Sequence, residues 1–475
     1  MNPIHIGSRR EFFWDDYLIA ETNAQIVQHE PVYRGDVFTC DHPWEGNNCM
    51  YFVVLQDEDR YRMYYRGQDI FNDDGTEFII QQRGVWCYAE STDGIHWDRP
   101  NLGLWEFQGS MDNNIILGDK WRDNFYVFKD TNPNCPPEAR YKGLEGRHDP
   151  FGLHCYTSTD GIHFTYQGLV TDNGAFDSMN VCFWDSQAEE YRCYLRDFHG
   201  STDPNDKFGP GSIRDVRISR SKDFVTWTEP EQIAFMEDQP DLPLYTNQIQ
   251  PYYRGEHVRI GFPTRYIERH WSESFDALPA PQHRKNRMST TERLGTAITD
   301  CVVMTSRDGT HFDRRDEVFM GPGPESYVNW VYGDGFPAYG ILEVPSPIPG
   351  ADPEIAMFLP RNNQVKPVTV SRWGIRRDGF FSLKSTYKPC FLKTKPLIFA
   401  GSQLHLNFST SAAGSMVLTL ITEDGTRYDS CEIFGDSTDR IIAFPGLSDL
   451  SCLAGKPVVL EATMRDSHLY SLKFE

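Results

Sequence analysis

The sequence lacks any long hydrophobic run. No stretch of its 475 residues approaches the ~20 apolar residues of a membrane-spanning helix, so we expect no membrane partner. The opening MNPIHIGSRREFFWDD has no apolar segment of the signal-peptide kind. The 11 cysteines form no C-x-x-C pair, and Cys182 and Cys193 lie inside apolar strand-like runs as expected buried thiols. We therefore expect a reducing, cytoplasmic location, or secretion if a leader peptide has been removed.

The signatures of several enzyme classes are also missing. The chain contains no H-E-x-x-H, G-x-S-x-G, G-x-G-x-x-G or G-x-x-x-x-G-K-[ST] pattern. Zinc-protease, serine-hydrolase, dinucleotide and P-loop chemistries therefore lack support. We expect no cofactor, and the sequence indicates no metal ligand set, although an axial cation coordinated by propeller residues stays open. Basic residues are in deficit, 46 against 68 acidic residues, giving a net charge of −22 that disfavours nucleic acid as a partner.

Helical periodicity is nearly absent, whereas one short phrase recurs. In it a strand ends at Ser, a tight turn follows at Asp-Gly, and an aromatic residue begins the next strand. The copies are S-T-D-G-I-H-W (91–97), S-T-D-G-I-H-F (158–164), S-K-D-F-V-T-W (221–227), S-R-D-G-T-H-F (306–312) and a degenerate R-R-D-G-F-F (376–381).

The repeat predicts the architecture. Each unit of about 65 residues supplies about four antiparallel strands, as in a propeller blade, although a β-sandwich array competes with this interpretation. We predict an all-β chain with a five-bladed β-propeller at 1–384 that carries the catalytic site. The polar insertion at 269–293 is expected to be a long loop. At 385–475 short alternating strands without the phrase predict a C-terminal β-sandwich.

These features resemble the five-bladed glycoside hydrolases of family 32 (β-fructofuranosidases, levanases) and family 43 (arabinanases, xylosidases). The segment R-R-D-G-F-F-S-L with T-K-P-L-I-F-A-G-S-Q-L-H-L-N resembles the domain junction of bacterial family-32-like proteins. The family-32 pattern W-M-N-D-P-N-G, the R-D-P triplet and the E-C dipeptide are absent, so sucrose or fructan is not assigned as substrate. The resemblance implies paired carboxylates on the innermost strands of successive blades, in an acidic pocket at the propeller axis.

In the first blade the candidates lie in D-H-P-W-E-G-N-N-C-M. By its position in the resemblance, Glu45 is the candidate nucleophile or base, with Asp41 in reserve. Trp44 is a candidate wall of the sugar subsite, and Asn47 a candidate partner of a sugar hydroxyl. A solvated loop acid is the alternative interpretation of Glu45.

In the next two blades the resemblance indicates Asp123 and Asp177. Asp123 precedes F-Y-V-F, where related enzymes hold an aspartate that orients the sugar, although Asp130 is a rival and a strand-end cap is the alternative. Asp177 takes the general acid's place, where the families have Glu. Glu325 of the fifth blade is the substitute acid, beside Trp330 as a stacking surface.

Further candidates would recognise the substrate. Tyr245 and Asn247 of the fourth blade are suited to sugar hydroxyls. Arg66 and Arg196 close apolar strands and would pair with an axial carboxylate or a substrate carboxyl group, or else lie on the outer rim.

The function predicted is an exo-acting glycoside hydrolase that removes a terminal sugar from an oligosaccharide. Two alternatives stay open. One is a non-catalytic sugar-binding propeller, and the other is a glycoside phosphorylase whose phosphate pocket would use Arg66, Arg196 or His42.

Overall fold

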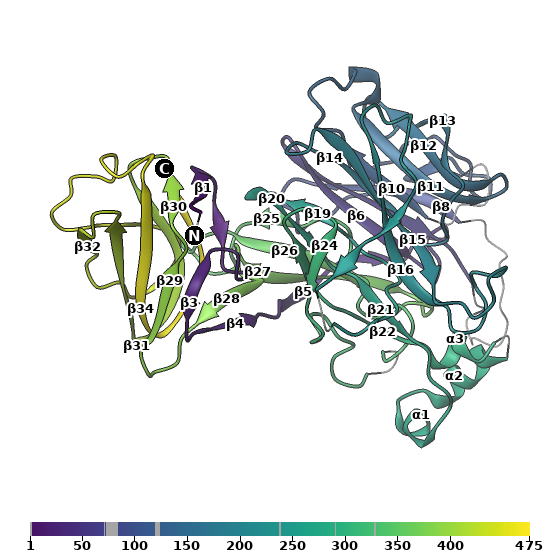
Figure 1. The fold of residues 1–475 in the computed structure, drawn as a ribbon. Helices are drawn as coiled ribbons and strands as arrows, with labels where there is room; N and C mark the ends of the chain where they lie inside the picture. Colours follow the sequence, from purple (N-terminus) through teal and green to yellow (C-terminus); the bar gives the residue numbers. More distant parts are fainter. Residues whose placement is uncertain are drawn as a thin grey trace.

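The computed structural model describes residues 2–70, 72, 84–118, 124–236, 239–289, 291–326 and 329–475. Strands dominate it, in two parts that Figure 1 shows side by side: a ring of small sheets and a curled sheet that holds both chain termini. The predicted all-β chain with a five-bladed propeller is confirmed.

Each blade is a twisted antiparallel sheet whose first strand is innermost. Blade I consists of β6 (Met50–Asp57), β7 (Arg60–Gly67), β8 (Val85–Ser91) and β9 (Ile115–Leu117). Blade II consists of β10 (Phe125–Lys129), β11 (Tyr141–His148), β12 (Phe151–Ser158) and β13 (Thr165–Thr171), with a 3-10 turn at Pro137–Ala139. Blade III consists of β14 (Val181–Asp185), β15 (Glu190–His199), β16 (Ile213–Ser221) and β17 (Glu231–Gln232).

Blades IV and V depart from this plan. Blade IV consists of β19 (Gln250–Tyr252), β20 (Gly255–Gly261), β23 (Met304–Ser306), β24 (His311–Arg314) and β18 (Ala234–Phe235), with a hairpin of β21 (Thr264–Ile267) and β22 (Ile298–Cys301). Blade V consists of β25 (Leu342–Val344), β26 (Glu354–Arg361), β27 (Val368–Arg376) and the N-terminal strand β5 (Val32–Cys40). Because β5 pairs with β27, the two ends of the propeller sequence are hydrogen-bonded and the ring is closed.

The second part is one hydrogen-bonded sheet, curled around its own apolar core. The expected sandwich is thus a single sheet. From residue 381 onward it contains β28 (Phe381–Lys384), β29 (Cys390–Thr394), β30 (Leu397–Phe399), β31 (Leu404–Thr422), β32 (Arg427–Asp429), β33 (Asp436–Ile442) and β34 (Pro457–Phe474).

The N-terminal strands join this sheet as well. They are β1 (Ile4–Gly7), β2 (Glu11–Phe12), β3 (Ile19–Thr22) and β4 (Gln25–Gln28). The expected range 1–384 for the propeller therefore needs correction at both ends, because residues 4–28 and β28 pair outside it. The degenerate phrase at 376–381 leads from β27 into β28, which explains why it lacks the full pattern.

The repeated phrase forms the same turn in each complete copy. In the first copy the Ser91 hydroxyl accepts from the Asp93 and Gly94 amides, while the Asp93 carboxylate accepts from the amides of Ile95 and His96 (both 2.8 Å). Gly94 has φ +70°, a conformation that favours glycine. The predicted Asp-Gly turn is therefore confirmed.

These turns also join neighbouring blades. Arg62 and Tyr64 of β7 donate to the turn carbonyls of Asp160 and Gly161 in blade II, at 2.7 and 2.9 Å. In the same way Tyr194 of β15 donates to the turn carbonyl of Gly309 in blade IV at 2.7 Å. The copies at 158–164 and 306–312 therefore both close a turn and accept hydrogen bonds from a neighbouring blade.

The turn aspartates predict loss of stability in acid. Burial alone would raise the pKa of Asp308, but hydrogen bonds from the His311 and Thr310 amides lower it to about 2. A depressed folded-state pKa stabilises the fold above the unfolded value, near 3.9, and this stability is lost as the pH falls toward 2. We expect thermal unfolding midpoints to fall between pH 4 and pH 2. An Asp308→Asn variant, scanned by circular dichroism, should show a shallower fall than the wild type; equal slopes would contradict this.

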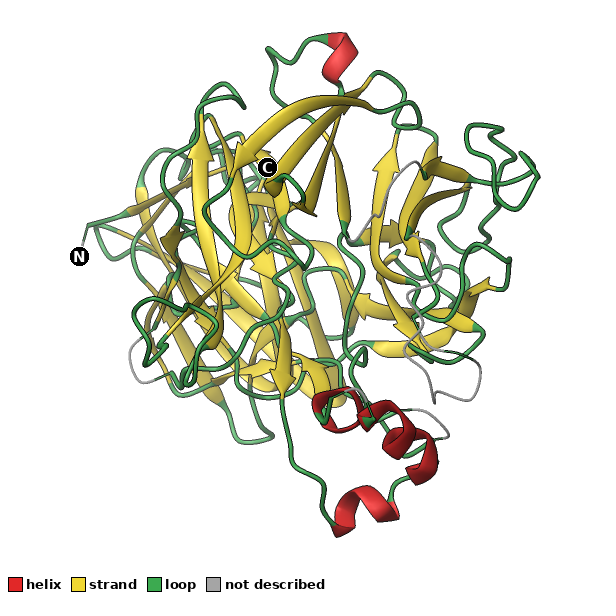
Figure 2. Cartoon of the chain, turned by 90° about the vertical axis from the view of Figure 1, so that its right-hand side faces the viewer, coloured by secondary structure: helices red, strands yellow, loops and turns green. Residues whose placement is uncertain are grey.

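The polar insertion is not the predicted loop, because it contains helices. These are α1 (Glu273–Ala277), α2 (Pro281–Met288) and α3 (Arg293–Thr296), which Figure 2 shows at one end of the molecule. None of the helices that the structure describes is long and apolar enough to cross a membrane.

Candidate functional site

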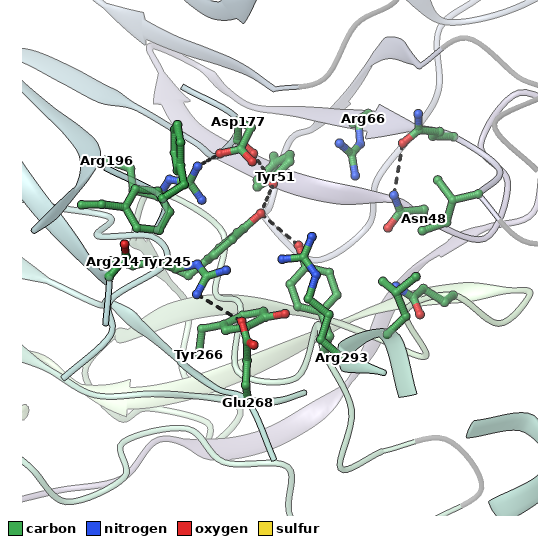
Figure 3. A pocket seen from close by; sticks show the side chains of 18 of the residues that line it. Asn48, Tyr51, Arg66, Asp177, Arg196, Arg214, Tyr245, Tyr266, Glu268 and Arg293 are labelled. Carbon is green, nitrogen blue, oxygen red and sulfur yellow. Dashed lines mark hydrogen bonds and ion pairs between the residues drawn. The ribbon is translucent and has the colours of Figure 1, made fainter. Parts of the chain in front are cut away.

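A cavity of about 700 Å³ opens at the propeller axis, at the end where the innermost strands begin (Figure 3). Its wall combines residues from blades I, III, IV and V with the insertion helices. The polar and aromatic residues that line it are Asn48, Tyr51, Arg66, Gln68, Asp177, Arg196, Phe198, Phe208, Ser212, Arg214, Tyr245, Tyr266, Glu268, Arg293, Tyr332 and Gln364.

The axis beyond the cavity is filled by side chains. Val53 of β6, Tyr126 of β10 and Tyr339 are buried in one apolar cluster, and the rings of Tyr126 and Tyr339 pack edge to face at 4.7 Å. The Tyr126 hydroxyl is satisfied by the Cys182 carbonyl at 2.8 Å. Packed aromatic rings of this kind leave no passage between these described side chains.

A bulge in β6 places Tyr51 in the pocket. Met50 pairs with Arg66 and Val53 with Tyr64, so β6 has one more residue than β7 in this stretch. Tyr51 takes the strain with φ 57°, a left-handed conformation that is rare outside glycine. A bulge re-aims the side chains on either side of it, and here it turns the Tyr51 ring toward the axis.

Tyrosine hydroxyls connect three parts of the pocket. The Tyr51 hydroxyl donates to the Asp177 carbonyl at 3.3 Å and lies 3.4 Å from the Tyr245 hydroxyl, to which Tyr332 donates at 3.3 Å. Burial raises the pKa of Tyr332 well above its usual value, and the neighbouring Tyr245 adds to this shift. Burial likewise raises the pKa of Tyr266. At neutral pH Tyr332 and Tyr266 are therefore uncharged hydrogen-bond donors.

Two carboxyl groups reach the cavity. Asp177 precedes β14, has a side chain 48% exposed, and forms an ion pair with the buried Arg196 of β15. Glu268 follows β21, has a side chain 51% exposed, and lies 3.5 Å from Arg214. In the view of Figure 3 the hydroxyl of Tyr245 lies between them. Both carboxylates are therefore accessible to a ligand while a guanidinium fixes each in place.

The described wall of the pocket is not acidic, contrary to our expectation. The charged side chains that line it are Asp177, Glu268, Arg66, Arg196, Arg214 and Arg293. Guanidinium groups therefore outnumber carboxylates, in a protein whose net charge is −22.

Among the sequence candidates, the structure brings Asp177, Arg66, Arg196 and Tyr245 together in this pocket. The Arg66 guanidinium lies over the Tyr51 ring at 4.8 Å. Burial, together with Arg214, lowers the pKa of Arg196, although Tyr245 opposes the shift. Asp123 lies outside the described residues.

Glu45 lies outside the pocket, fully buried in the segment that precedes β6 of blade I. Its carboxylate accepts hydrogen bonds from the Tyr65 hydroxyl (2.6 Å), from Arg99 Nε (2.8 Å) and from the His42 amide (2.9 Å). Glu45 is not among the residues that line the pocket. A carboxylate held this way is positioned to stabilise the blade.

The other first-blade candidates surround Glu45. Asp41 is exposed and His42 is half-buried. The Trp44 indole donates a hydrogen bond to Asn114, and the Asn47 side chain accepts one from the Ile70 amide. The possible ligand atoms of Asp41, His42 and Glu45 lie within 4.8 Å of one another, close enough to suggest a cation site. Arg99 occupies this position, at 3.6 Å from Asp41 and 2.8 Å from Glu45.

The remaining candidates also lie outside the pocket lining. Asn247 is buried and receives the Ile249 amide at 3.1 Å, a structural role at the start of blade IV. Glu325 is exposed. Trp330 has φ 61°, donates to the Gly323 carbonyl, and receives a hydrogen bond from Arg284 on its own carbonyl.

Several pocket residues were not among the sequence candidates. Asn48 and Tyr51 lie one and four positions after Asn47, and the bulge in β6 explains why Tyr51 faces the pocket. Arg214 follows the turn-rich P-N-D-K-F-G-P-G-S, and Glu268 and Arg293 flank the polar insertion. The unusual length of that insertion in an otherwise regular repeat was the available signal.

No protein-family model matches the sequence. Over 162 residues, 33% of the chain, it is 30% identical to the uncharacterized protein Rv1502 of Mycobacterium tuberculosis (strain ATCC 25618 / H37Rv), of which it covers 43%. Over 158 residues, also 33% of the chain, it is 30% identical to the uncharacterized protein MT1551 of Mycobacterium tuberculosis (strain CDC 1551 / Oshkosh), again covering 43%. The chain thus matches less than half the length of these curated relatives.

Solved structures are similar in fold at low sequence identity. The glycoside hydrolase family 43 arabinoxylan arabinofuranohydrolase from Bacillus subtilis has a TM-score of 0.38 at 13% identity, over 90% of this protein and 96% of that one. The catalytic domain of the Coprinopsis cinerea GH62 alpha-L-arabinofuranosidase has a TM-score of 0.42 at 10% identity, over 73% and 97%. The Bombyx mori GH32 beta-fructofuranosidase BmSUC1 has a TM-score of 0.38 at 9% identity, over 93% and 94%. All three likenesses have TM-scores below 0.5 and concern the overall fold alone.

Proposed function

We propose that the protein is a glycoside hydrolase that cleaves a terminal sugar in the axial pocket. The observation that supports this most directly is the pair of accessible carboxylates, Asp177 and Glu268, in a cavity of about 700 Å³. This volume is in the range of small-molecule sites, roughly 300–1,000 Å³. Glycoside hydrolysis requires two carboxyl groups that flank the scissile bond.

The contacts of the two carboxylates suggest different roles. An adjacent guanidinium favours the ionised form of a carboxyl group, and Arg196 pairs directly with Asp177. Asp177 is therefore suited to act as the nucleophile or as the base that takes a proton from water. Glu268, held less closely by Arg214 at 3.5 Å, is our candidate for the acid that protonates the departing glycosidic oxygen. This revises the role of Asp177 from acid to base or nucleophile.

Exo action follows from the closed end of the cavity. Side chains packed around Tyr126 and Tyr339 fill the propeller beyond the cavity, and a pocket without a second opening admits the end of a glycan chain and not its middle. Tyr266 offers a neutral hydroxyl donor for a sugar hydroxyl. The products are expected to be monosaccharides from the first turnover.

The test is a panel of aryl glycosides of pentofuranoses, fructofuranose, common pyranoses and their uronic acids, followed by end-labelled oligosaccharides. Release of monosaccharide only, with the remaining glycan shortened by one unit per step, supports the proposal. Mixed oligosaccharide products would contradict exo action. No release, combined with a sugar that raises the melting temperature, would instead support a non-catalytic binding propeller.

The arginines favour a glycoside phosphorylase as the second candidate. In this reaction a phosphate oxygen would bond to the anomeric carbon while the glycosidic bond breaks and Glu268 protonates the leaving oxygen. The product would be a glycosyl phosphate. A requirement for inorganic phosphate in turnover distinguishes this reaction from hydrolysis.

A further inference from the structure

The positive charge in the pocket exceeds what its described carboxylates balance. Arg196 has Asp177 as its ion-pair partner, and Arg214 shares Glu268 at the longer distance of 3.5 Å. Arg293 forms no ion pair or side-chain hydrogen bond that involves a described residue, yet its side chain lines the cavity. Arg293 is exposed, whereas the Arg214 side chain is only 14% exposed, so an anion that contacts both would neutralise a guanidinium that water reaches poorly.

Arg214 is held in place with little of its hydrogen-bonding capacity used, since among the described residues its guanidinium donates to Glu268 at the long distance of 3.5 Å. Its guanidinium lies 4.2 Å from the centre of the Tyr266 ring and 5.5 Å from that of Phe198. Its Nε is shielded from solvent and has no acceptor among the described residues. Stacking on an aromatic ring fixes the plane of a guanidinium and leaves its edge available for an oxyanion.

Arg293 approaches the same ring from a different part of the sequence. It begins α3, and Figure 3 shows its side chain and that of Arg214 in the cavity near Tyr266. Arg293 and Arg214 both lower the pKa of Tyr266 against the larger effect of burial, as expected of two cations near its hydroxyl.

The insertion that carries Arg293 is anchored to blade V. Arg284 of α2 donates to the carbonyls of Asn329 and Trp330 at 2.6 and 2.7 Å. Arg287 donates to Gln364, itself a pocket residue, at 2.7 Å. The blade repeat does not require this insertion, so its effect is to place Arg293 over the pocket.

We propose that Arg214 and Arg293 form a subsite for an anionic oxygen group, a carboxylate or a phosphate, of the substrate. This inference rests on the proposed glycoside-cleaving function. The anion has two sources, the carboxylate of a sugar acid in the cleaved residue or free inorganic phosphate. Arginine suits both, because its planar donors match two oxygens at once.

The experiment compares 4-nitrophenyl glucuronides and galacturonides with the matching glucosides and galactosides, in both anomers and with or without phosphate. Each sugar pair differs only in its carboxylate. For a sugar-acid substrate we expect kcat/KM to favour the uronide by about 100-fold, and Arg293→Gln to reduce this ratio about 30-fold. Arg269→Gln, an exposed arginine of the same insertion that does not line the cavity, is the control and should keep the wild-type ratio.

Phosphate dependence that Arg293→Gln weakens would instead identify phosphate as the anion bound at this subsite. Preference for neutral sugars, no phosphate dependence and an unchanged ratio in the variant would overturn the inference and leave the proposed hydrolase intact. If no glycoside is cleaved, the proposed function fails. Titration calorimetry with glucuronate, galacturonate, phosphate and glucose then tests the anion subsite independently of activity. Anion binding that the variant weakens supports the subsite, and absence of anion binding refutes it.

Discussion

Replacement of Asp177 by Asn is expected to lower kcat about a thousandfold, with a much smaller change in KM. The amide keeps the size of the side chain and one oxygen for Arg196, but it can neither attack the anomeric carbon nor take a proton from water. Loss of a group that acts in the transition state reduces kcat more than ground-state binding. Steady-state kinetics on whichever glycoside the wild-type protein cleaves would measure this effect.

The control for Asp177→Asn is Asp172→Asn, which changes a carboxyl outside the pocket lining. It should retain wild-type kcat. Asp177→Ala in the presence of formate or azide adds a second readout, because a small anion that enters the vacated space can restore a nucleophile or base. Wild-type turnover in Asp177→Asn would move the chemistry to other residues. Equal loss in both aspartate variants would indicate damage to the fold.

The propeller was predictable because its signal is local and repeated. Each Ser-x-Asp-Gly phrase specifies its own turn, and the aromatic residue that follows packs into the blade, as buried Phe312 shows. Ring closure was not predictable in this way. The pairing of β5 with β27 joins residues more than three hundred positions apart, and no local pattern distinguishes β5 from a strand of blade I.

The pocket was half predictable for a related reason. Asp177 and Tyr245 were found because the start of an innermost strand must face the axis. Glu45 satisfied the same rule in sequence but not in space. The chain bends between it and β6, and the one-residue bulge in β6 presents Tyr51 to the axis. A register shift of one residue moves the side chains of a strand to the opposite face of the sheet. A strand in which apolar and polar residues alternate only a few times does not reveal such a shift in its sequence.

The charge of the pocket was beyond sequence reasoning altogether. Arg196 and Arg214 lie on neighbouring strands of blade III, whereas Arg293 comes from the insertion in blade IV. Their convergence depends on how the insertion folds. Its helices contain few apolar residues, so the sequence shows no apolar periodicity that would predict them. An overall charge of −22 masks a local cluster of the opposite sign.

Glu45→Ala is expected to lower the free energy of unfolding by about 3–5 kcal/mol, because it removes one partner of a buried ion pair. The Arg99 guanidinium, only 17% exposed, would lose its carboxylate, and the Tyr65 hydroxyl would lose its acceptor. Equilibrium unfolding in urea, followed by tryptophan fluorescence, measures the change. Glu106→Ala, a glutamate in the same blade that is not fully buried, is the matched control and should change the free energy by less than about 0.5 kcal/mol.

Activity separates this structural role of Glu45 from the catalytic role that the resemblance implied. Glu45→Gln keeps the shape and an oxygen acceptor, so it should fold at moderate temperature and retain kcat within a few-fold of the wild type. If Glu45→Gln instead loses turnover by orders of magnitude while its unfolding free energy stays at the wild-type value, Glu45 returns to the active site. A Glu45 variant that is destabilised but still active would assign Glu45 and Arg99 to the stability of blade I. An Asp177→Asn variant that is stable but inactive would assign the chemistry to the arginine-lined pocket.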